Sequence, residues 1–297
     1  MKIESYNFNH LKGINTLNKN FKKENLYENI SEKKEQDYSF CNYIIPNAIS
    51  RARLINERVK LLKPLSEEEY AEIIKKITSD EYEKNPPFAY IGKYKDVDSD
   101  FIGLVPYCGE EDIHDEINCW LTARKCKNSA VAPDEKMANI VRALDYSLKK
   151  LDDRFGKFEG VVYRSGFFNP VTDKEYYSSS SSSLGAIDFG MCAPPSPKKQ
   201  YSIIKLKNGH KISDFQRYAN NKYSNKFAET EKEILIDRTS KFRLIPEEEY
   251  TEKDKRLKEE FLALVMSDTN EVTQRDIDFA LEEYGDRLDY ISIWEEI

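Results

Sequence analysis

The spacing of apolar residues changes from a helical pattern to an extended one near Gly160, and it changes back after Pro246. Before Gly160 the apolar residues recur at the period of one helix face. Between the two positions they stand in short β-branched and aromatic runs separated by turn residues, which is typical of strands. The pattern predicts an α+β protein in which helices come first, a compact sheet region spans 160–245, and a helical tail follows.

Individual elements follow from the same patterns and from their end signals. A helix is expected to end before Pro64, because proline breaks a helix interior, and Ser66-Glu-Glu-Glu69 is a capping-box sequence that opens the next one. Pro133-Asp134 opens a further helix with one long apolar stripe. Helices are predicted over 47–63, from 66, over 112–124, from 133, over 247–266 and from 273, and strands over 160–164, 201–206, 232–236 and 241–245.

The composition narrows the classes of partner. The 297 residues carry a net charge of −7, whereas nucleic acids and anionic membranes both require a basic surface, so neither is expected as a partner. The N-terminal residues lack the apolar core of a signal peptide, and the apolar runs are too short to span a bilayer. The five cysteines form no CxxC pair and the three histidines are far apart in sequence, so we expect no metal site, and free thiols in a reducing compartment.

Three features of the sheet region carry side chains suited to chemistry. Arg164 ends a predicted strand, a run of six serines begins at Ser178, and the pair Glu231 and Glu233 leads into a later strand. Taken singly, each has an ordinary explanation: a surface charge, a flexible linker and a solvated acidic face. Two tyrosines precede the serine run and apolar residues follow it, however, whereas a linker rarely begins and ends in residues that favour a core. The two carboxylates point the same way along a strand, and a cation would relieve their repulsion.

In their order and spacing these features resemble the arginine–serine–glutamate class of mono-ADP-ribosyltransferases, the toxins and related enzymes built like cholera and iota-type toxins. The pattern of that family is an aromatic residue and an arginine at a strand end, then aromatic-x-Ser-Thr-Ser, then Glu-x-Glu at the start of a later strand. In this sequence the three motifs read Tyr163-Arg164, Tyr176-Tyr177-Ser178-Ser179-Ser180 and Glu231-Lys232-Glu233.

Further matches and departures surround the motifs. The stretch "INCWLTARK" resembles the helix motif that precedes the family core, and Phe189 stands where the family has its nicotinamide-stacking aromatic residue. Serine replaces the usual central threonine at Ser179, which keeps the hydroxyl group. Arg124 falls later than the family arginine, because Thr122 occupies the expected place.

The resemblance covers roughly residues 110–246 and implies an ADP-ribosyltransferase-like core of two packed, mainly antiparallel β-sheets. A polar N-terminal arm (1–45) and an N-terminal helical region (46–109) precede this catalytic core, and a C-terminal helical extension (247–297) follows it. The serine run then belongs to an active-site strand.

The resemblance implies NAD⁺ as the donor of ADP-ribose, with no metal ion. Arg164 would hold the pyrophosphate, for which a guanidinium has a matching fork geometry. The backbone around Ser165 would bond the nicotinamide amide, Phe189 would stack on the nicotinamide ring, and Ser180 would shape the pocket for it.

Glu233 is the implied catalytic carboxylate, because breaking the N-glycosidic bond builds oxocarbenium character on the ribose. Ser178 would hold Glu233 in its rotamer through a hydrogen bond. Glu231 would orient and deprotonate an arginine of a target protein, since a guanidinium is a poor nucleophile by itself. The loop over about 218–230 would face that target.

Two other functions stay open at the level of the sequence: NAD⁺ glycohydrolysis, with water as the acceptor, and a catalytically inactive module whose helical arms dock a partner. The chain is expected to be made in a bacterial cytoplasm and, as an effector, to be delivered into host cytosol without a Sec signal peptide. Its end, "ALEEYGDRLDYISIWEEI", resembles translocation signals of such effectors and is equally well explained by an amphipathic C-terminal helix.

Overall fold

The structure is a computed structural model in which the chain divides into two units, residues 1–52 and 53–297. All elements named below belong to the second unit, which begins in a helical stretch over residues 53–59. The structure describes residues 50–78, 98–108, 113–124, 134–166, 168, 170, 174–192, 200–218, 232–266 and 271–297, without the side chains of 188–192 and 216–218.

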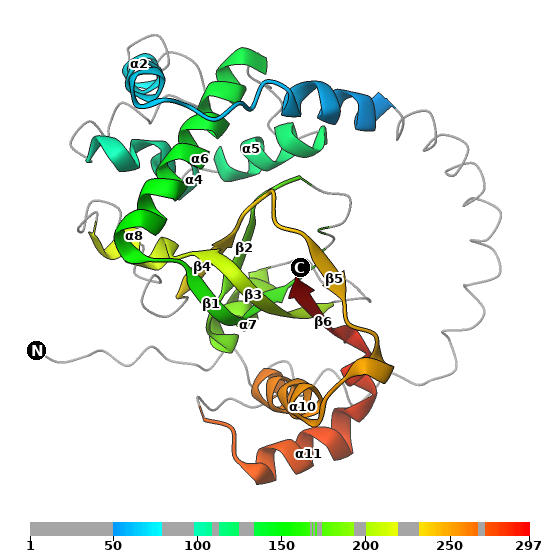
Figure 1. The fold of residues 1–297 in the computed structure, drawn as a ribbon. Helices are drawn as coiled ribbons and strands as arrows, with labels where there is room; N and C mark the ends of the chain where they lie inside the picture. Colours follow the sequence, from blue (N-terminus) through cyan, green and yellow to red (C-terminus); the bar gives the residue numbers. More distant parts are fainter. Residues whose placement is uncertain are drawn as a thin grey trace, which may run out of the picture. The chain divides into compact units, whose positions relative to one another are not determined.

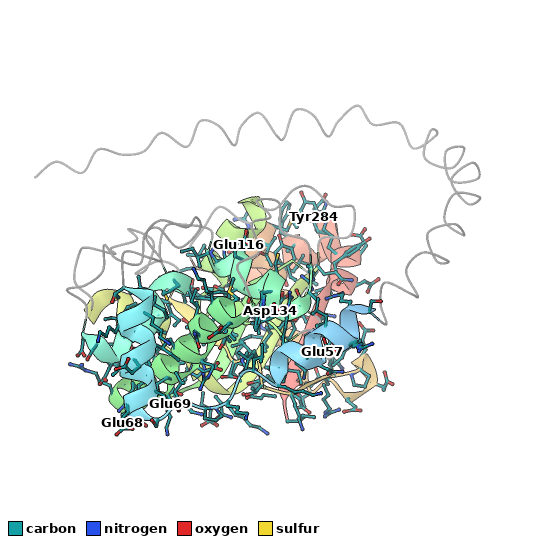
Figure 2. All side chains as sticks on the ribbon, turned by 90° about the horizontal axis from the view of Figure 1, so that it is seen from above. Glu57, Glu68, Glu69, Glu116, Asp134 and Tyr284 are labelled. Atoms are coloured by element: carbon teal, nitrogen blue, oxygen red, sulfur yellow. The ribbon has the colours of Figure 1, made fainter. Side chains whose placement is uncertain are left out.

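Helices precede the sheet, as predicted. The Ser66 side chain accepts from Glu69 N and the Glu69 side chain accepts from Ser66 N, so the capping box is formed at the start of α2. Figure 2 labels Glu68 and Glu69 in the first turn of this helix. At Gly103 a Cβ atom would lie 2.2 Å from Ala143 O, so only glycine allows this close approach of two backbones. The elements, which share one apolar core, are α2 (Glu67–Ile77), η4 (Ser99–Leu104), α4 (Val105–Cys108), α5 (Ile113–Thr122) and α6 (Asp134–Phe155).

Six strands form one hydrogen-bonded sheet in the described residues (Figure 1). Strand β1 pairs with both β2 and β3, β2 pairs with β4, and β4 pairs with β3, so four strands close a ring of pairings. All pairs are antiparallel except β3–β6. The strands are β1 (Phe158–Ser165), β2 (Tyr177–Ser180), β3 (Tyr201–His210), β4 (Glu233–Ile236), β5 (Phe242–Leu244) and β6 (Ile291–Glu296).

Further helices follow strands of this sheet. Helix α7 (Ser183–Cys192) comes directly after β2 and packs against β1, and α8 (Ile212–Tyr218) packs against β4. After β5 come η5 (Glu247–Glu249), α10 (Glu252–Met266), α11 (Gln274–Tyr284) and η6 (Gly285–Tyr290). Helices α10 and α11 pack against each other, and α10 also contacts α7.

Two expectations about the fold are wrong. We expected two packed sheets, but the described strands belong to one sheet, because β1 hydrogen-bonds to two neighbours. We also expected a tail that stays helical, but its last residues form β6. Ile291 and Ile293 are buried at alternate positions of that strand, which is the period of a strand rather than of a helix.

Strand β6 is tied into the sheet by a buried carboxylate. Glu296 accepts hydrogen bonds from Lys207 N at 2.7 Å, Asn208 N at 2.9 Å and Ser240 Oγ at 2.9 Å. A carboxylate that accepts several donors stabilises the segments it joins. The end of the described chain is therefore part of the folded core.

The expectation of free thiols throughout is also wrong. Cys108 is a free thiol, whereas Cys119 is disulfide-bonded. A disulfide needs two sulfur atoms that the fold brings together, and it does not need close spacing in the sequence.

Among the helices that the structure describes, none combines the length and the apolar character that a membrane crossing needs.

A buried histidine joins the helical region to the sheet. His210 Nδ1 lies 2.9 Å from Asp152 Oδ1 of α6, and its Nε2 lies 3.4 Å from Asp237 Oδ2 just after β4. Burial alone would lower the pKa of His210, but the two carboxylates outweigh it and raise the pKa to about 9.

We expect this histidine to make the stability of the fold fall at alkaline pH. Because its folded pKa exceeds the unfolded value, its contribution is fully present below about pH 6.5 and is lost as the pH rises through 9, amounting to about 3 kcal/mol. Urea unfolding between pH 7 and 9.5 measures the effect. His210→Gln should flatten the profile over that range, and an equally steep profile in the variant would contradict the assignment.

Candidate active site

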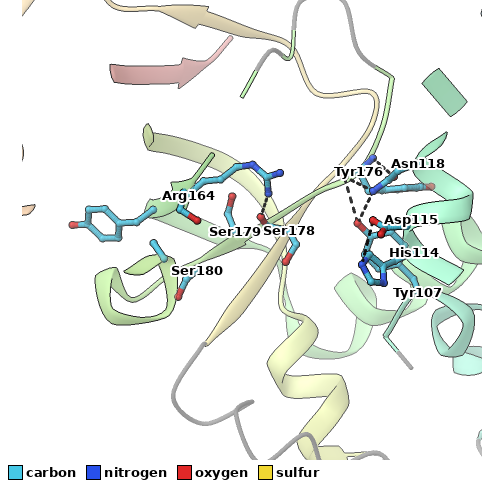
Figure 3. Close-up of a pocket in the computed structure, with 12 residues that line it drawn as sticks. Tyr107, His114, Asp115, Asn118, Arg164, Tyr176, Ser178, Ser179 and Ser180 are labelled. Atoms are coloured by element: carbon cyan, nitrogen blue, oxygen red, sulfur yellow. Dashed lines mark hydrogen bonds and ion pairs between the residues drawn. The ribbon is translucent and has the colours of Figure 1, made fainter. Parts of the chain in front are cut away.

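Three strands bring the predicted arginine, serine and glutamate together. Ser178 Oγ donates to Glu233 Oε1 at 2.5 Å. The Ser178 carbonyl oxygen accepts from Arg164 Nη1 (Figure 3). The strand register explains the meeting, since Tyr163 of β1 pairs with Ser180 of β2, and Ser180 also pairs with Glu233 of β4. Ser178 thus contacts both charged residues, which are far from it in the sequence.

A cavity of about 240 Å³ opens beside Ser178 and Arg164. Glu233 is not among its lining residues and reaches it through its hydrogen bond to Ser178. Burial raises the pKa of Tyr107 at the cavity wall, and the negative charge of Glu233 adds to the rise. The lining residues are Tyr107, His114, Asp115, Asn118, Tyr163, Arg164, Ser165, Tyr176, Ser178, Ser179, Ser180 and Ala186.

Arg164 is a partly buried cation that has no carboxylate within ion-pairing distance among the described residues. Its Nε is buried without a hydrogen-bond partner there, and its guanidinium carbon lies 5.2 Å from the centre of the Tyr177 ring. Burial lowers the pKa of Arg164, although a guanidinium stays protonated in proteins. Ser179 Oγ, also buried without a partner, lines the same cavity. Buried donors left unused at a cavity are a feature that a bound polar ligand explains.

Helix α5 holds the start of β2 in place. Asn118 Oδ1 accepts from Tyr176 N at 3.1 Å, and Asn118 Nδ2 donates to Tyr176 O at 3.1 Å. The Asn118 amide therefore satisfies the backbone N–H and the carbonyl oxygen of Tyr176, as a neighbouring strand would. Tyr176 stands two positions before Ser178.

The far end of Tyr176 is anchored to α6. Its hydroxyl donates to Asp145 Oδ1, and Arg238 donates to both oxygens of Asp145, at 3.3 Å and 2.7 Å. Because Arg238 follows β4 and Tyr176 precedes β2, this network fixes the two strands that carry Glu233 and Ser178 to one helix.

Of the other residues predicted for the site, two lie at the cavity and two cannot be placed. Ser165 ends β1 and lines the cavity, and Ser180 is buried, with its hydroxyl accepting from Ser182 N at 3.0 Å. Phe189 lies in α7, but its side chain is outside the description, and Glu231 and the 218–230 loop beyond α8 also lie outside the described residues. Their roles stay predictions.

The stretch "INCWLTARK" in and after α5 does not place an arginine where the resembling family has one. Thr122 is fully buried and donates to Asn118 O at 2.8 Å within the helix, so it places no charge at the cavity. Arg124, just after the helix, pairs with Glu175 at 3.4 Å, beside the start of β2.

Sequence reasoning missed three cavity residues on the helical side, Tyr107, His114 and Asp115. The ring of His114 contacts the ring of Tyr107 edge-on, with the centres 6.0 Å apart. A signal was present, because His114 and Asn118 are four residues apart on one face of α5, next to its apolar stripe. No group of three or more side chains able to hold a metal ion occurs within the described ranges.

No family model matches the sequence, and no curated protein matches it. Two crystal structures of the type III effector XopAI from Xanthomonas axonopodis pv. citri are similar to the chain, each at 11% sequence identity. The first, truncated by 70 N-terminal residues, has a TM-score of 0.39 over 85% of this chain and 99% of that one. The second has a TM-score of 0.40 over 82% and 92%. Similarity at this level assigns neither a fold nor a function.

Proposed function

We propose that the chain transfers ADP-ribose from NAD⁺ to an arginine side chain of a target protein and releases nicotinamide. The observation that carries the proposal is the double contact of Ser178, which bonds Arg164 through its carbonyl and Glu233 through its hydroxyl beside a cavity. The family resemblance that joins these three residues also implies an effector or toxin that acts on a host protein.

The electrostatics of Arg164 favour an anionic ligand. The chain has a net charge of −7, so its surroundings repel phosphates unless a local cation offsets them. Arg164 supplies that cation, and its Nε donor is unused among the described residues. A pyrophosphate would accept from the guanidinium fork and offset the burial of its charge.

The size of the cavity favours one end of a dinucleotide. Its volume of about 240 Å³ is below the roughly 300–1,000 Å³ of pockets that enclose a whole drug-sized ligand. The nicotinamide riboside half would enter, and the rest of NAD⁺ would extend outward past Arg164.

The role proposed for Glu233 is electrostatic stabilisation of the transition state. As the N-glycosidic bond breaks, its electron pair leaves with nicotinamide, and positive charge develops on the ribose. A carboxylate held in one orientation by Ser178 stabilises that charge without reorganising. The target guanidinium then bonds to the ribose carbon and loses a proton, which the resemblance assigns to Glu231.

Labelling of proteins tests the reaction. Incubation with NAD⁺ labelled in its adenylate half and a eukaryotic cell lysate should give labelled protein, with the label on arginine by mass spectrometry. Free ADP-ribose and nicotinamide alone would identify a glycohydrolase, and the absence of any NAD⁺ turnover would support an inactive binding module. Label on serine, cysteine or nucleic acid would contradict the acceptor proposed through Glu231.

A further inference from the structure

The serine run continues beyond the three serines that belong to the family motif, and Ser181 is the next residue. It follows β2 directly, where Ser180 pairs with Glu233. Both its N–H and its hydroxyl donate to the carbonyl oxygen of Lys232, at 3.2 Å and 2.8 Å. Ser181 therefore fixes the carbonyl oxygen of the peptide group that precedes Glu233 with two hydrogen bonds.

Lys232 has an unusual backbone conformation. Its φ of 45° lies in the left-handed region, which side chains other than glycine rarely adopt. Among the described non-glycine residues, Ala123 shares this feature, and it ends α5, where Arg124 N donates back to Cys119 O as at many helix ends. Lys232 is instead followed at once by Glu233. A strained residue persists where its surroundings hold it, and such residues cluster at functional sites.

We propose that Ser181 is a positioning residue that sets the direction from which Glu233 reaches Ser178. A peptide group is planar, so holding the Lys232 oxygen fixes the plane up to the Cα atom of Glu233. The 2.5 Å hydrogen bond between Glu233 and Ser178 depends on that direction. This inference rests on the proposed function for its kinetic effect, but its structural effect can be measured without NAD⁺.

The kinetic experiment compares single serine substitutions within the run. Ser181→Ala should lower kcat for nicotinamide release roughly tenfold to a hundredfold, with KM for NAD⁺ nearly unchanged, because the carboxylate is misplaced rather than lost. Ser181→Thr keeps the hydroxyl and should restore kcat. Ser182→Ala is the matched control, since the Ser182 hydroxyl accepts from Gly185 N at 3.3 Å at the start of α7.

Repeating the Ser181→Ala substitution in a chain that also carries Lys232→Gly tests whether Ser181 acts through Lys232. Glycine adopts a positive φ at no steric cost, so Lys232→Gly should shrink the effect of Ser181→Ala. A normal kcat in Ser181→Ala would overturn the proposal. So would an equal loss in Ser182→Ala, or a failure of Ser181→Thr to restore activity.

Amide hydrogen exchange in the free chain separates this inference from the proposed function. Ser181→Ala should speed exchange at the facing ends of β2 and β4 roughly tenfold, whereas Ser182→Ala should not. If the wild-type chain does not turn over NAD⁺ but exchange responds in this way, the proposed function fails and the positioning role stands. Unchanged exchange in Ser181→Ala would overturn the positioning role.

Discussion

Replacing Glu233 with glutamine is expected to slow NAD⁺ cleavage by a factor of about a hundred to a thousand or more, with little change in NAD⁺ affinity. The carboxylate acts on charge that exists only in the transition state, so its loss lowers kcat and not binding. The amide oxygen of glutamine can still accept from Ser178 Oγ, so the local structure is preserved. Nicotinamide release at saturating and limiting NAD⁺, with calorimetric affinities, measures both quantities.

Glu295→Gln is the matched control for this substitution. Glu295 is also a strand glutamate, but its side chain pairs with Arg243 of β5, whereas that of Glu233 is bonded to Ser178. Exposed pairs of this kind contribute little to stability, so the control should keep wild-type kcat. Wild-type turnover in Glu233→Gln would remove Glu233 from the chemistry.

Replacing Arg164 with methionine is expected to abolish measurable NAD⁺ binding without lowering the thermal stability of the free chain. Arg164 is partly buried, its Nε is fully buried without a hydrogen-bond partner, and it has no carboxylate to pair with among the described residues, so its charge is a cost to folding in the absence of ligand. An apolar side chain of similar length removes that cost together with the anion site. Calorimetric titration with NAD⁺ and thermal unfolding of the free proteins test the two halves of the prediction.

Arg238→Met provides the contrast for Arg164. Arg238 is also partly buried, but it is bonded to both oxygens of Asp145, and its removal leaves that carboxylate without its partner cation. We therefore expect Arg238→Met to unfold at a clearly lower temperature than Arg164→Met. Equal destabilisation of the two variants would show that Arg164 serves the fold, as Arg238 does.

Local signals in the sequence predicted local structure well. The capping box at Ser66 and the stripe that begins after Pro133 are confirmed in α2 and α6, because both depend on residues within a few turns of each other. Strand β6 was missed, since its alternating residues follow a long helical pattern directly. The pairing of β1 with two strands was also missed, because pairing partners depend on contacts between segments far apart in the chain.

The candidate site shows the same division. The family resemblance implied a hydrogen bond from Ser178 to Glu233, and the two side chains are hydrogen-bonded in the structure. The clamp of Asn118 on the Tyr176 backbone could not be predicted, because it requires the relative placement of α5 and β2. Glu231 lies outside the described residues, so the choice of acceptor still rests on the resemblance alone.

The most direct test of the account is a crystal structure of the Glu233→Gln chain with NAD⁺. The account predicts one NAD⁺ per chain, with its pyrophosphate against Arg164 and its nicotinamide riboside in the cavity beside Ser178. A dinucleotide bound elsewhere, or none at saturating concentration while the Arg164 guanidinium keeps its present contacts, would contradict it.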